Sequence, residues 1–232
     1  MMEFKPQRVE PKSWRFWFKE GLSLSTRNIF SFALLALLAS ATHYLPGFLR
    51  GLTVLVIPLL LAFGVVLADS VDKSNRFFSR ISKIPLVVWA RLFAAVSMPS
   101  LLFFVLSVVL INIIPPIGDQ GGDMLELMLI WFIIAGYLLW FVVPLTVIAE
   151  LPLIESFYQS LEALYLNRWF FRIILAFGFT AYLFALFLPI LFIPWYAMAS
   201  SMMYVSFRHI WMGERDNNPV PVSSGLPIAV SK

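Results

Sequence analysis

The chain has 232 residues, of which 60% are hydrophobic and 13% are charged, and its mean hydropathy is +0.86. These values are typical of polytopic membrane proteins and lie outside the usual range of soluble domains. The absence of cysteine excludes disulfides, thiolate metal sites and catalytic thiols, and two histidines leave little for an imidazole metal centre. We therefore predict no cofactor and no metal, and we interpret the net charge of +4 as a topology signal, not as a nucleic-acid signal.

An amphipathic helix is predicted ahead of the first apolar segment. Its large apolar residues recur at helical spacing, at Trp14, Trp17, Phe18 and Leu22. Arg15 and Lys19 lie beside them, and we expect these two cations to contact anionic lipid headgroups. The helix is therefore expected to lie along the membrane surface.

Five charge-poor segments follow, and each is long enough to cross about 30 Å of hydrocarbon. They are Ile29–Leu49, Gly51–Ala68, Leu92–Ile117, Leu127–Ala149 and Ile173–Phe207. The last segment fits either two spans joined near Pro189–Pro194 or one long span with a surface segment, and we favour two. The sequence thus predicts an all-α polytopic membrane protein with six transmembrane helices.

Lys and Arg residues set the predicted orientation. All but Arg50 of the 17 fall on the side that holds both termini and the two long connections. The positive-inside rule then predicts a bacterial inner-membrane protein with cytoplasmic N and C termini. We expect a cytoplasmic segment with an interfacial helix (1–28), a six-helix membrane domain (29–212) and a disordered cytoplasmic tail (213–232).

Two further amphipathic segments are predicted on the cytoplasmic side. In the first, the cations Arg76, Arg80 and Lys83 form a basic stripe that we expect to contact anionic lipid. The second has a helical apolar face formed by Ile154, Phe157, Tyr158, Leu161, Leu164 and Tyr165. Its other face carries Glu155, Gln159 and Glu162, which we predict as a partner interface because acidic groups are exceptional on this basic side.

The chain also shows signs of an internal repeat and of close helix packing. An offset of 139 residues aligns one helix, asparagine and aromatic entry with another, pairing Phe18, Leu22, Asn28, Phe30 and Phe32 with Phe157, Leu161, Asn167, Trp169 and Phe171. Small residues four apart would let helices approach closely, as in Ala36 with Ser40, Gly64 with Ala68, and Ala197 with Ser201. We expect these small residues to pack within the chain's own bundle.

Four stretches carry a resemblance to a known family. They are "WFKEGLSLSTRNIF" (17–30), "GVVLADSVDKS" (64–74), "ESFYQSLEALYLNRWF" (155–170) and "ASSMMYVSFRHIW" (199–211). With them the chain resembles an uncharacterised family of six-span proteobacterial inner-membrane proteins, related to the YciC-like group and to the membrane region of some glycerophosphodiester phosphodiesterases. The resemblance implies a six-helix membrane fold. It implies no catalytic residues, because the 232 residues hold no counterpart of the soluble phosphodiesterase domain.

Catalytic chemistry finds little support in the sequence. The chain has no Gly-rich phosphate loop, nucleophile elbow or paired-histidine motif, and the middles of the predicted spans hold no ionisable residue. Asp119, Asp123 and Glu126 lie close together in an external turn, but their number is too low for a typical calcium loop. We therefore expect a solvated acidic turn and no enzymatic activity.

Two functions remain open at this point. The first is a non-catalytic accessory or scaffolding component of a membrane complex, with membrane lipids and another membrane protein or a second copy of itself as partners. The alternative is a carrier or organiser of lipid or another apolar substrate, which would need no buried charge.

Overall fold

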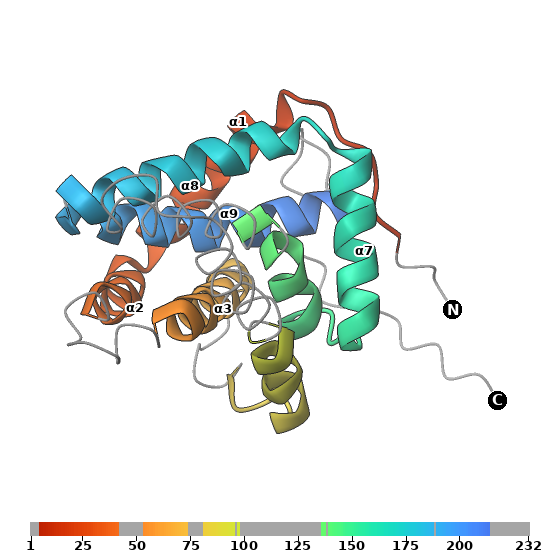
Figure 1. Ribbon diagram of the computed structural model, residues 1–232, viewed down its shortest axis with the longest axis horizontal. Coiled ribbons are helices and arrows are strands. Elements are labelled where there is room, and N and C mark those ends of the chain that lie inside the picture. The colour runs from red at the N-terminus through yellow and green to blue at the C-terminus, as the bar shows by residue number, and fades with distance from the viewer. Residues whose placement is uncertain are drawn as a thin grey trace, which may run out of the picture.

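The computed structural model describes residues 5–41, 53–73, 81–95, 97, 136–137, 139–187 and 189–213. Within these ranges the regular structure is entirely helical, which confirms the predicted all-α class. Figure 1 shows the main helices, which are α1 (Ser13–Arg27), α2 (Ile29–Ala41), α3 (Thr53–Asp72), α7 (Leu153–Leu166), α8 (Phe170–Phe187) and α9 (Phe192–Met212). Shorter helical segments are Leu86–Ala95 and residues 139–147. The predicted acidic turn at residues 119–126 and the predicted cytoplasmic tail from residue 214 lie outside the described residues.

Two helix pairs turn a corner at an asparagine. α1 and α2 are separated by Asn28, which leaves the helical conformation at φ −138° and ψ 55°, and the two helices are bent by 98°. Asn167 ends α7 with similar angles, φ −114° and ψ 49°, ahead of α8. The predicted repeat therefore has a structural counterpart in two helix, asparagine and helix units.

α8 and α9 form a helical hairpin joined by the 3-10 turn η3 (Pro189–Leu191). The long apolar run of residues 173–207 thus contains two helices and not one, as we favoured from the sequence. Pro189 starts the turn because proline lacks the N–H that a helix interior requires. α9 ends at Gly213, whose φ of +66° is a left-handed conformation that glycine adopts without strain.

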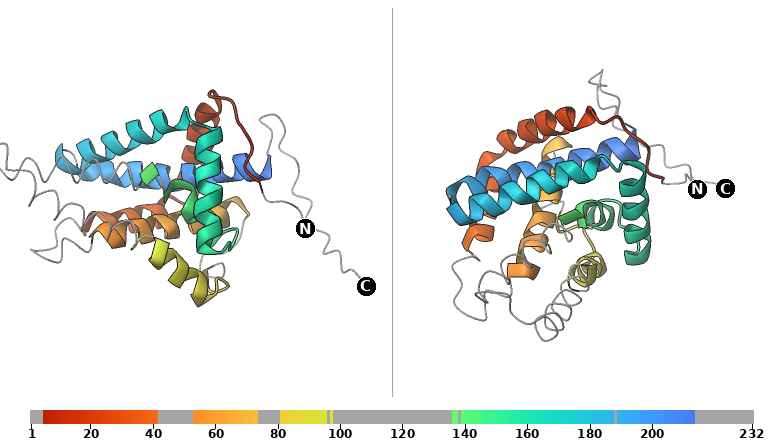
Figure 2. Two further views of the ribbon diagram at one scale, coloured as in Figure 1. Left: turned by 45° about the vertical axis from the view of Figure 1, so that its right-hand side comes forward. Right: turned by 45° about the horizontal axis from the view of Figure 1, so that its top comes forward.

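The helices differ in direction as well as in position. Both views in Figure 2 show α8 and α9 side by side, and the left view shows α7 running across the end of this hairpin. In the first unit α1 packs along α9, and α2 is bent away from α1 by 98°. In the second unit the order is reversed, because α7 crosses the end of the hairpin and α8 runs beside α9.

α9 is the central helix of the described bundle and contacts α1, α2, α3 and α8. Glycine allows two of these contacts to be close. A Cβ atom added at Gly64 of α3 would lie 2.6 Å from Ser200 Cβ, and one added at Gly21 of α1 would lie 3.0 Å from Met202 Cγ. On a third side, α9 packs its small residues and Tyr196 against Ala36 of α2.

The predicted packing role of the small residues is confirmed. Five of the six small residues singled out from the sequence are buried within the chain's own bundle, namely Ala36, Gly64, Ala68, Ala197 and Ser201. Ser40 is half-buried. Close helix approach therefore accounts for the small residues of α2, α3 and α9 without a second protein.

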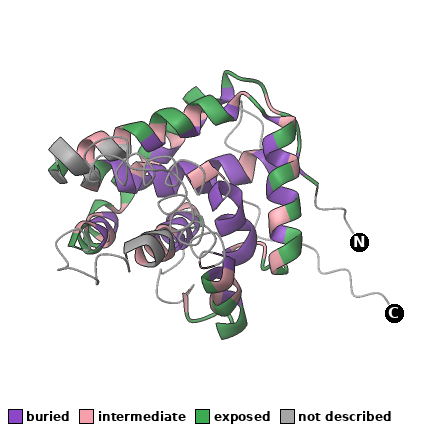
Figure 3. Ribbon diagram, in the orientation of Figure 1, coloured by how far each residue is buried: buried purple, intermediate pink, exposed green. Residues whose placement is uncertain are grey.

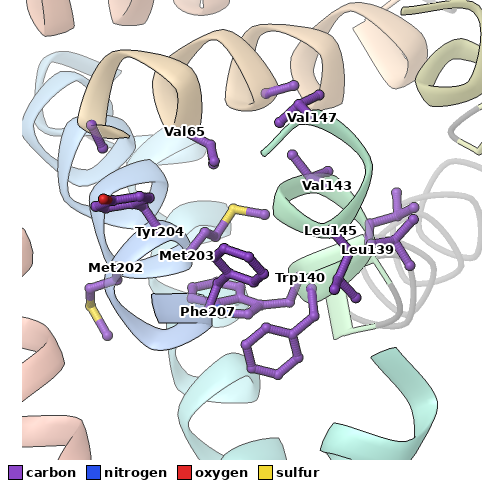
Figure 4. Close-up of a cluster of buried hydrophobic side chains, with 14 of the residues drawn as sticks. Val65, Leu139, Trp140, Val143, Leu145, Val147, Met202, Met203, Tyr204 and Phe207 are labelled. Carbon is purple, nitrogen blue, oxygen red and sulfur yellow. The ribbon is translucent and has the colours of Figure 1, made fainter. Parts of the chain in front are cut away.

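The apolar core lies between α9, α3 and residues 139–147. Figure 4 shows Met203 and Phe207 of α9 packed beside Trp140, with Val65 of α3 and Val143 close by. The Trp140 indole N–H donates a hydrogen bond to Ser206 Oγ at 3.0 Å. This contact fixes residues 139–147 against the middle of α9.

A helix that crosses a membrane needs about 20 consecutive, mainly apolar residues. No single helix among the described residues is both long and apolar enough to cross a membrane. The bent pair of α1 and α2 satisfies the length and composition requirements together.

The second helix extends beyond its apolar segment. The charge-poor segment ends at Ala68, and α3 continues to Asp72. The extra turn brings Asp69 and Asp72 into the bundle, where ion pairs with Lys73 and Arg208 stabilise them. A hydropathy window ends at the first charge, whereas a helix continues as long as its charges find partners.

Candidate functional site

The four stretches that carry the family resemblance meet at one end of the bundle. Trp17 and Glu20 come from α1, Asp72 from α3, Asn167 from the corner between α7 and α8, and Arg208 from α9. Far-separated segments thus build one polar cluster, and this cluster is the strongest candidate for a functional site in the described part of the chain.

Arg208 is the centre of the cluster. Its Nη1 atom lies 2.5 Å from Asp72 Oδ2, which also accepts a hydrogen bond from the Tyr204 hydroxyl at 2.7 Å. Its Nη2 atom lies 4.0 Å from Glu20 Oε1. Only 12% of the Arg208 side chain is exposed, so its charge is largely removed from solvent and needs these carboxylates. Arg208 therefore links α9 to both α3 and α1.

A second ion pair lies one turn earlier in α3. Lys73 Nζ lies 2.7 Å from Asp69 Oδ1, and the Asp69 side chain is 1% exposed whereas Lys73 is about half exposed. The two residues are four apart in sequence, which places them on one side of the helix terminus. The pair keeps the Asp69 carboxylate compensated inside the bundle while the lysine reaches the surface.

Aromatic contacts fix α1 against α9 beside the ion pairs. The indole N–H of buried Trp17 donates to His209 Nδ1 at 2.8 Å. The Trp17 ring stacks on Trp169 with centroids 5.5 Å apart, and it meets the edge of Phe170 at 5.1 Å. His209 is thus a hydrogen-bond acceptor within the bundle.

Asn167 holds an N-terminal strap, which we define as residues 5–12. The fully buried Asn167 side chain accepts from the Val9 N–H at 2.9 Å and donates to the Gln7 carbonyl at 3.2 Å. The Gln7 N–H donates to the Ile210 carbonyl at 2.9 Å, and the Trp169 indole donates to the Val9 carbonyl at 3.3 Å. Backbone hydrogen bonds therefore fasten the strap across the α7–α8 corner and the end of α9.

The cluster is structural in its chemistry. We call its paired side chains the latch, namely Trp17, Glu20, Asp69, Asp72, Lys73, Tyr204, Arg208 and His209. Its carboxylates accept from Arg208, Lys73 and Tyr204, and its one imidazole accepts from Trp17. The described residues hold no group of three His, Asp or Glu side chains that could bind a metal ion. What the arrangement can do is to couple the position of α1 to that of α3 and α9.

The predicted lipid-contacting cations are only partly described. Arg15 and Lys19 on α1 and Lys83 near the start of the Leu86–Ala95 helix are exposed. Arg76 and Arg80 lie outside the described residues. The exposed positions are compatible with the predicted role, which stays a prediction.

α7 has three faces instead of the two that we predicted. Its buried face is small and polar and consists of Ser156, Gln159, Ser160, Ala163 and Leu164. Its opposite face is apolar and exposed, with Ile154, Tyr158, Leu161 and Tyr165 between 51% and 84% exposed. Glu155 is exposed and Glu162 half-buried along one edge, and Gln159 is buried and donates to Glu155 at 2.9 Å. Gln159 therefore lies inside the protein, and only the two glutamates are placed to meet a partner.

The latch residues were missed because each has an ordinary explanation in the sequence. Asp69 and Asp72 follow an apolar run, where a solvated helix end is expected, and Arg208 counts as a positive-inside charge. One signal was available, because acidic residues on the cytoplasmic side at the end of a span have no topological role. Two of them three apart at the predicted end of the second span, together with an arginine at the predicted end of the last span, suggest an ion pair.

The chain matches no protein-family model, and it is significantly similar to no curated protein and to no solved structure.

Proposed function

We propose that this protein is a non-catalytic integral protein of the bacterial inner membrane that serves as an accessory or scaffolding component of a membrane complex. The observation that carries the proposal is an outer surface that is apolar over several helices. Soluble monomeric proteins rarely expose large contiguous apolar patches. Here the outer sides of several helices are apolar, although the bundle also has an apolar core in which polar residues of α3 and α9 are buried, including Asp69, Ser70, Ser200 and Ser206.

The apolar outer surface is extensive. On α2 the exposed large residues are Ile29, Phe30, Leu34, Leu37 and Leu38, and on α8 they are Phe171, Leu175 and Phe179. Figure 3 shows α9 mostly buried and the outer sides of α2, α7 and α8 largely exposed. Lipid is the solvent in which such a surface is stable without a further protein layer. This supports the six-span topology as the finer form of the proposal.

Two amphipathic helices support the same topology. α1 and α7 each expose an apolar stripe, with Trp14, Phe18 and Leu22 on α1. Amphipathic helices of this kind lie in the plane of a membrane surface. We place both on the cytoplasmic side, where the positive-inside rule also places the chain termini.

The scaffolding role rests on α7. Its acidic edge, Glu155 and Glu162, borders the exposed apolar stripe, while its polar interior face is occupied by the protein itself. An apolar stripe next to two like charges fits a partner segment that is apolar and basic. Because the latch residues pair with one another, the α7 surface is the better candidate for contact with a second protein.

Mild extraction of the tagged full-length protein at native level, followed by mass spectrometry of bound proteins and lipids, tests this function. We expect a stoichiometric membrane polypeptide, and we expect the double variant Glu155→Lys/Glu162→Lys to lose it. Glu10→Lys, which reverses an exposed acidic residue outside α7, is the matched control. Selective retention of one lipid without any polypeptide would replace the scaffold by a lipid carrier or organiser.

A further inference from the structure

The surface formed by the strap and α1 is more basic than its sequence suggests, because one of its two acidic residues is half-buried. Its exposed cations are Lys5, Arg8, Lys12, Arg15, Lys19 and Arg27. Two acidic residues occur among residues 5–27, and only Glu10 is exposed, because Glu20 is half-buried and turned towards Arg208. The latch therefore removes a negative charge from this surface, and six exposed cations face one exposed carboxylate.

The hydrogen bonds that hold the strap bring this basic surface close to cations from a distant part of the chain. Arg8 lies between Gln7 and Val9, whose backbone atoms are bound by Asn167 and Trp169. Trp169 is flanked by the exposed Arg168, and Arg172 is exposed three residues further on, in the first turn of α8. These hydrogen bonds hold the backbone on either side of Arg8 at the corner that carries the two arginines, about 160 residues away in sequence.

Exposed aromatic residues accompany these cations. The Arg168 guanidinium lies 5.2 Å from the Tyr165 ring centroid, and the Arg15 guanidinium lies 5.7 Å from that of Trp14. Both rings are exposed. Aromatic and basic side chains in alternation are the usual composition at the level of lipid headgroups, where the ring meets the acyl boundary and the cation meets phosphate.

We propose that the strap, the outer face of α1 and the first turn of α8 form one binding surface for anionic phospholipid headgroups, centred on Arg8, Arg168 and Arg172. The proposal rests on the membrane-embedded function proposed above and names the lipid class that this end of the protein binds. Phosphodiesters suit the surface because arginine donates two parallel hydrogen bonds to phosphate oxygens. Exposed Trp14 and Tyr165 favour a lipid over a soluble anion.

The test uses the purified full-length protein in bilayer nanodiscs that contain neutral phosphatidylcholine and a minority of anionic phosphatidylglycerol. Native mass spectrometry of the protein released from the discs gives the ratio of the two bound lipids. We expect several-fold enrichment of the anionic lipid over the input ratio. The triple variant Arg8→Gln/Arg168→Gln/Arg172→Gln should return to the input ratio. The variant with Lys at the same positions should retain part of the enrichment, because lysine keeps the charge but cannot donate two parallel hydrogen bonds.

Two controls connect the result to the structure. All three arginines are exposed, so both triple variants should keep the wild-type midpoint of thermal unfolding. Asn167→Ala, which releases the strap while keeping every charge, should give an enrichment between that of the wild type and that of the glutamine variant. Equal enrichment in the glutamine variant and the wild type, or no enrichment in the wild type, would overturn the lipid surface. Failure of the wild type to enter the bilayer would instead overturn the proposed membrane location.

Discussion

Arg208 of α9 and Asp72 of α3 form an ion pair with 2.5 Å between Nη1 and Oδ2, although they are 136 residues apart in sequence. The pair joins the last turns of two helices that run side by side, since Gly64 and Ser200 touch further along the same two helices. Tyr204, one turn before Arg208, donates to the same carboxylate. One end of the α3–α9 contact is thus held by charge and the other by close packing.

Removing one partner of this ion pair should be costly. Arg208→Met leaves the Asp72 carboxylate, only 19% exposed, with the Tyr204 hydroxyl as its remaining described donor. We expect the free energy of unfolding in detergent to fall by about 2–4 kcal/mol. Glu20→Gln is the matched control, because Glu20 lies 4.0 Å from Arg208 and is more exposed, and it should cost about 1 kcal/mol or less. Equal losses for the two variants would contradict the ranking of the two contacts.

The close approach of α3 and α9 makes a second prediction. Gly64→Ala places a Cβ 2.6 Å from Ser200 Cβ and 2.7 Å from its Oγ, so one helix must shift. We expect a loss of about 1–3 kcal/mol in the free energy of unfolding. Gly136→Ala is the control, because a Cβ there meets no atom of the described residues within 4 Å and alanine favours the helix.

A second-site variant separates overpacking at this position from other causes of instability. Ser200→Gly in the Gly64→Ala background removes the atoms that the new methyl group meets, and it should restore part of the lost stability. If the double variant is as unstable as Gly64→Ala alone, the Ser200 contact is not the cause.

The hydrogen bonds between Asn167 and the strap predict that Asn167→Ala has a local effect on amide hydrogen exchange. The truncation removes the acceptor of the Val9 N–H and the donor to the Gln7 carbonyl. Amide hydrogen exchange should therefore accelerate at Val9, and also at Gln7 when the strap leaves the end of α9. The helices themselves should keep their protection. Asn28→Ala is the matched control, because it changes the corresponding corner without touching the strap. Faster exchange at Val9 in that variant would refute the idea that the Asn167 hydrogen bonds hold the strap.

Local features of the fold could be predicted from sequence alone. The corners at Asn28 and Asn167, the helix break at Pro189 and the burial of Gly64 all follow from short-range chemistry that a few neighbouring residues determine. The amphipathic helices α1 and α7 were likewise visible as helical spacing of apolar residues. These features depend on the chain within one or two helical turns.

Long-range relationships could not be predicted in the same way. The position of Asp72 opposite Arg208 depends on how α3 and α9 align, and no spacing along the chain encodes that alignment. The burial of Gln159 was hidden because a two-face interpretation of α7 assigns every polar residue to solvent. In a protein with an apolar exterior that rule fails, since small and polar residues mediate helix packing there.

Gln159 allows a final prediction that separates stability from partner binding. Its Nε2 donates to Glu155, but its buried Oε1 accepts no hydrogen bond from the part of the chain that the structure describes. Gln159→Met removes that acceptor while keeping the volume, so we expect the free energy of unfolding to change by less than about 1 kcal/mol or to rise. Partner retention after mild extraction should be unchanged, because Glu155 and Glu162 keep their positions along the edge of α7. A loss of the partner with Gln159→Met alone would show that the interface involves the buried face of α7, and the helix would then have to turn or detach to bind.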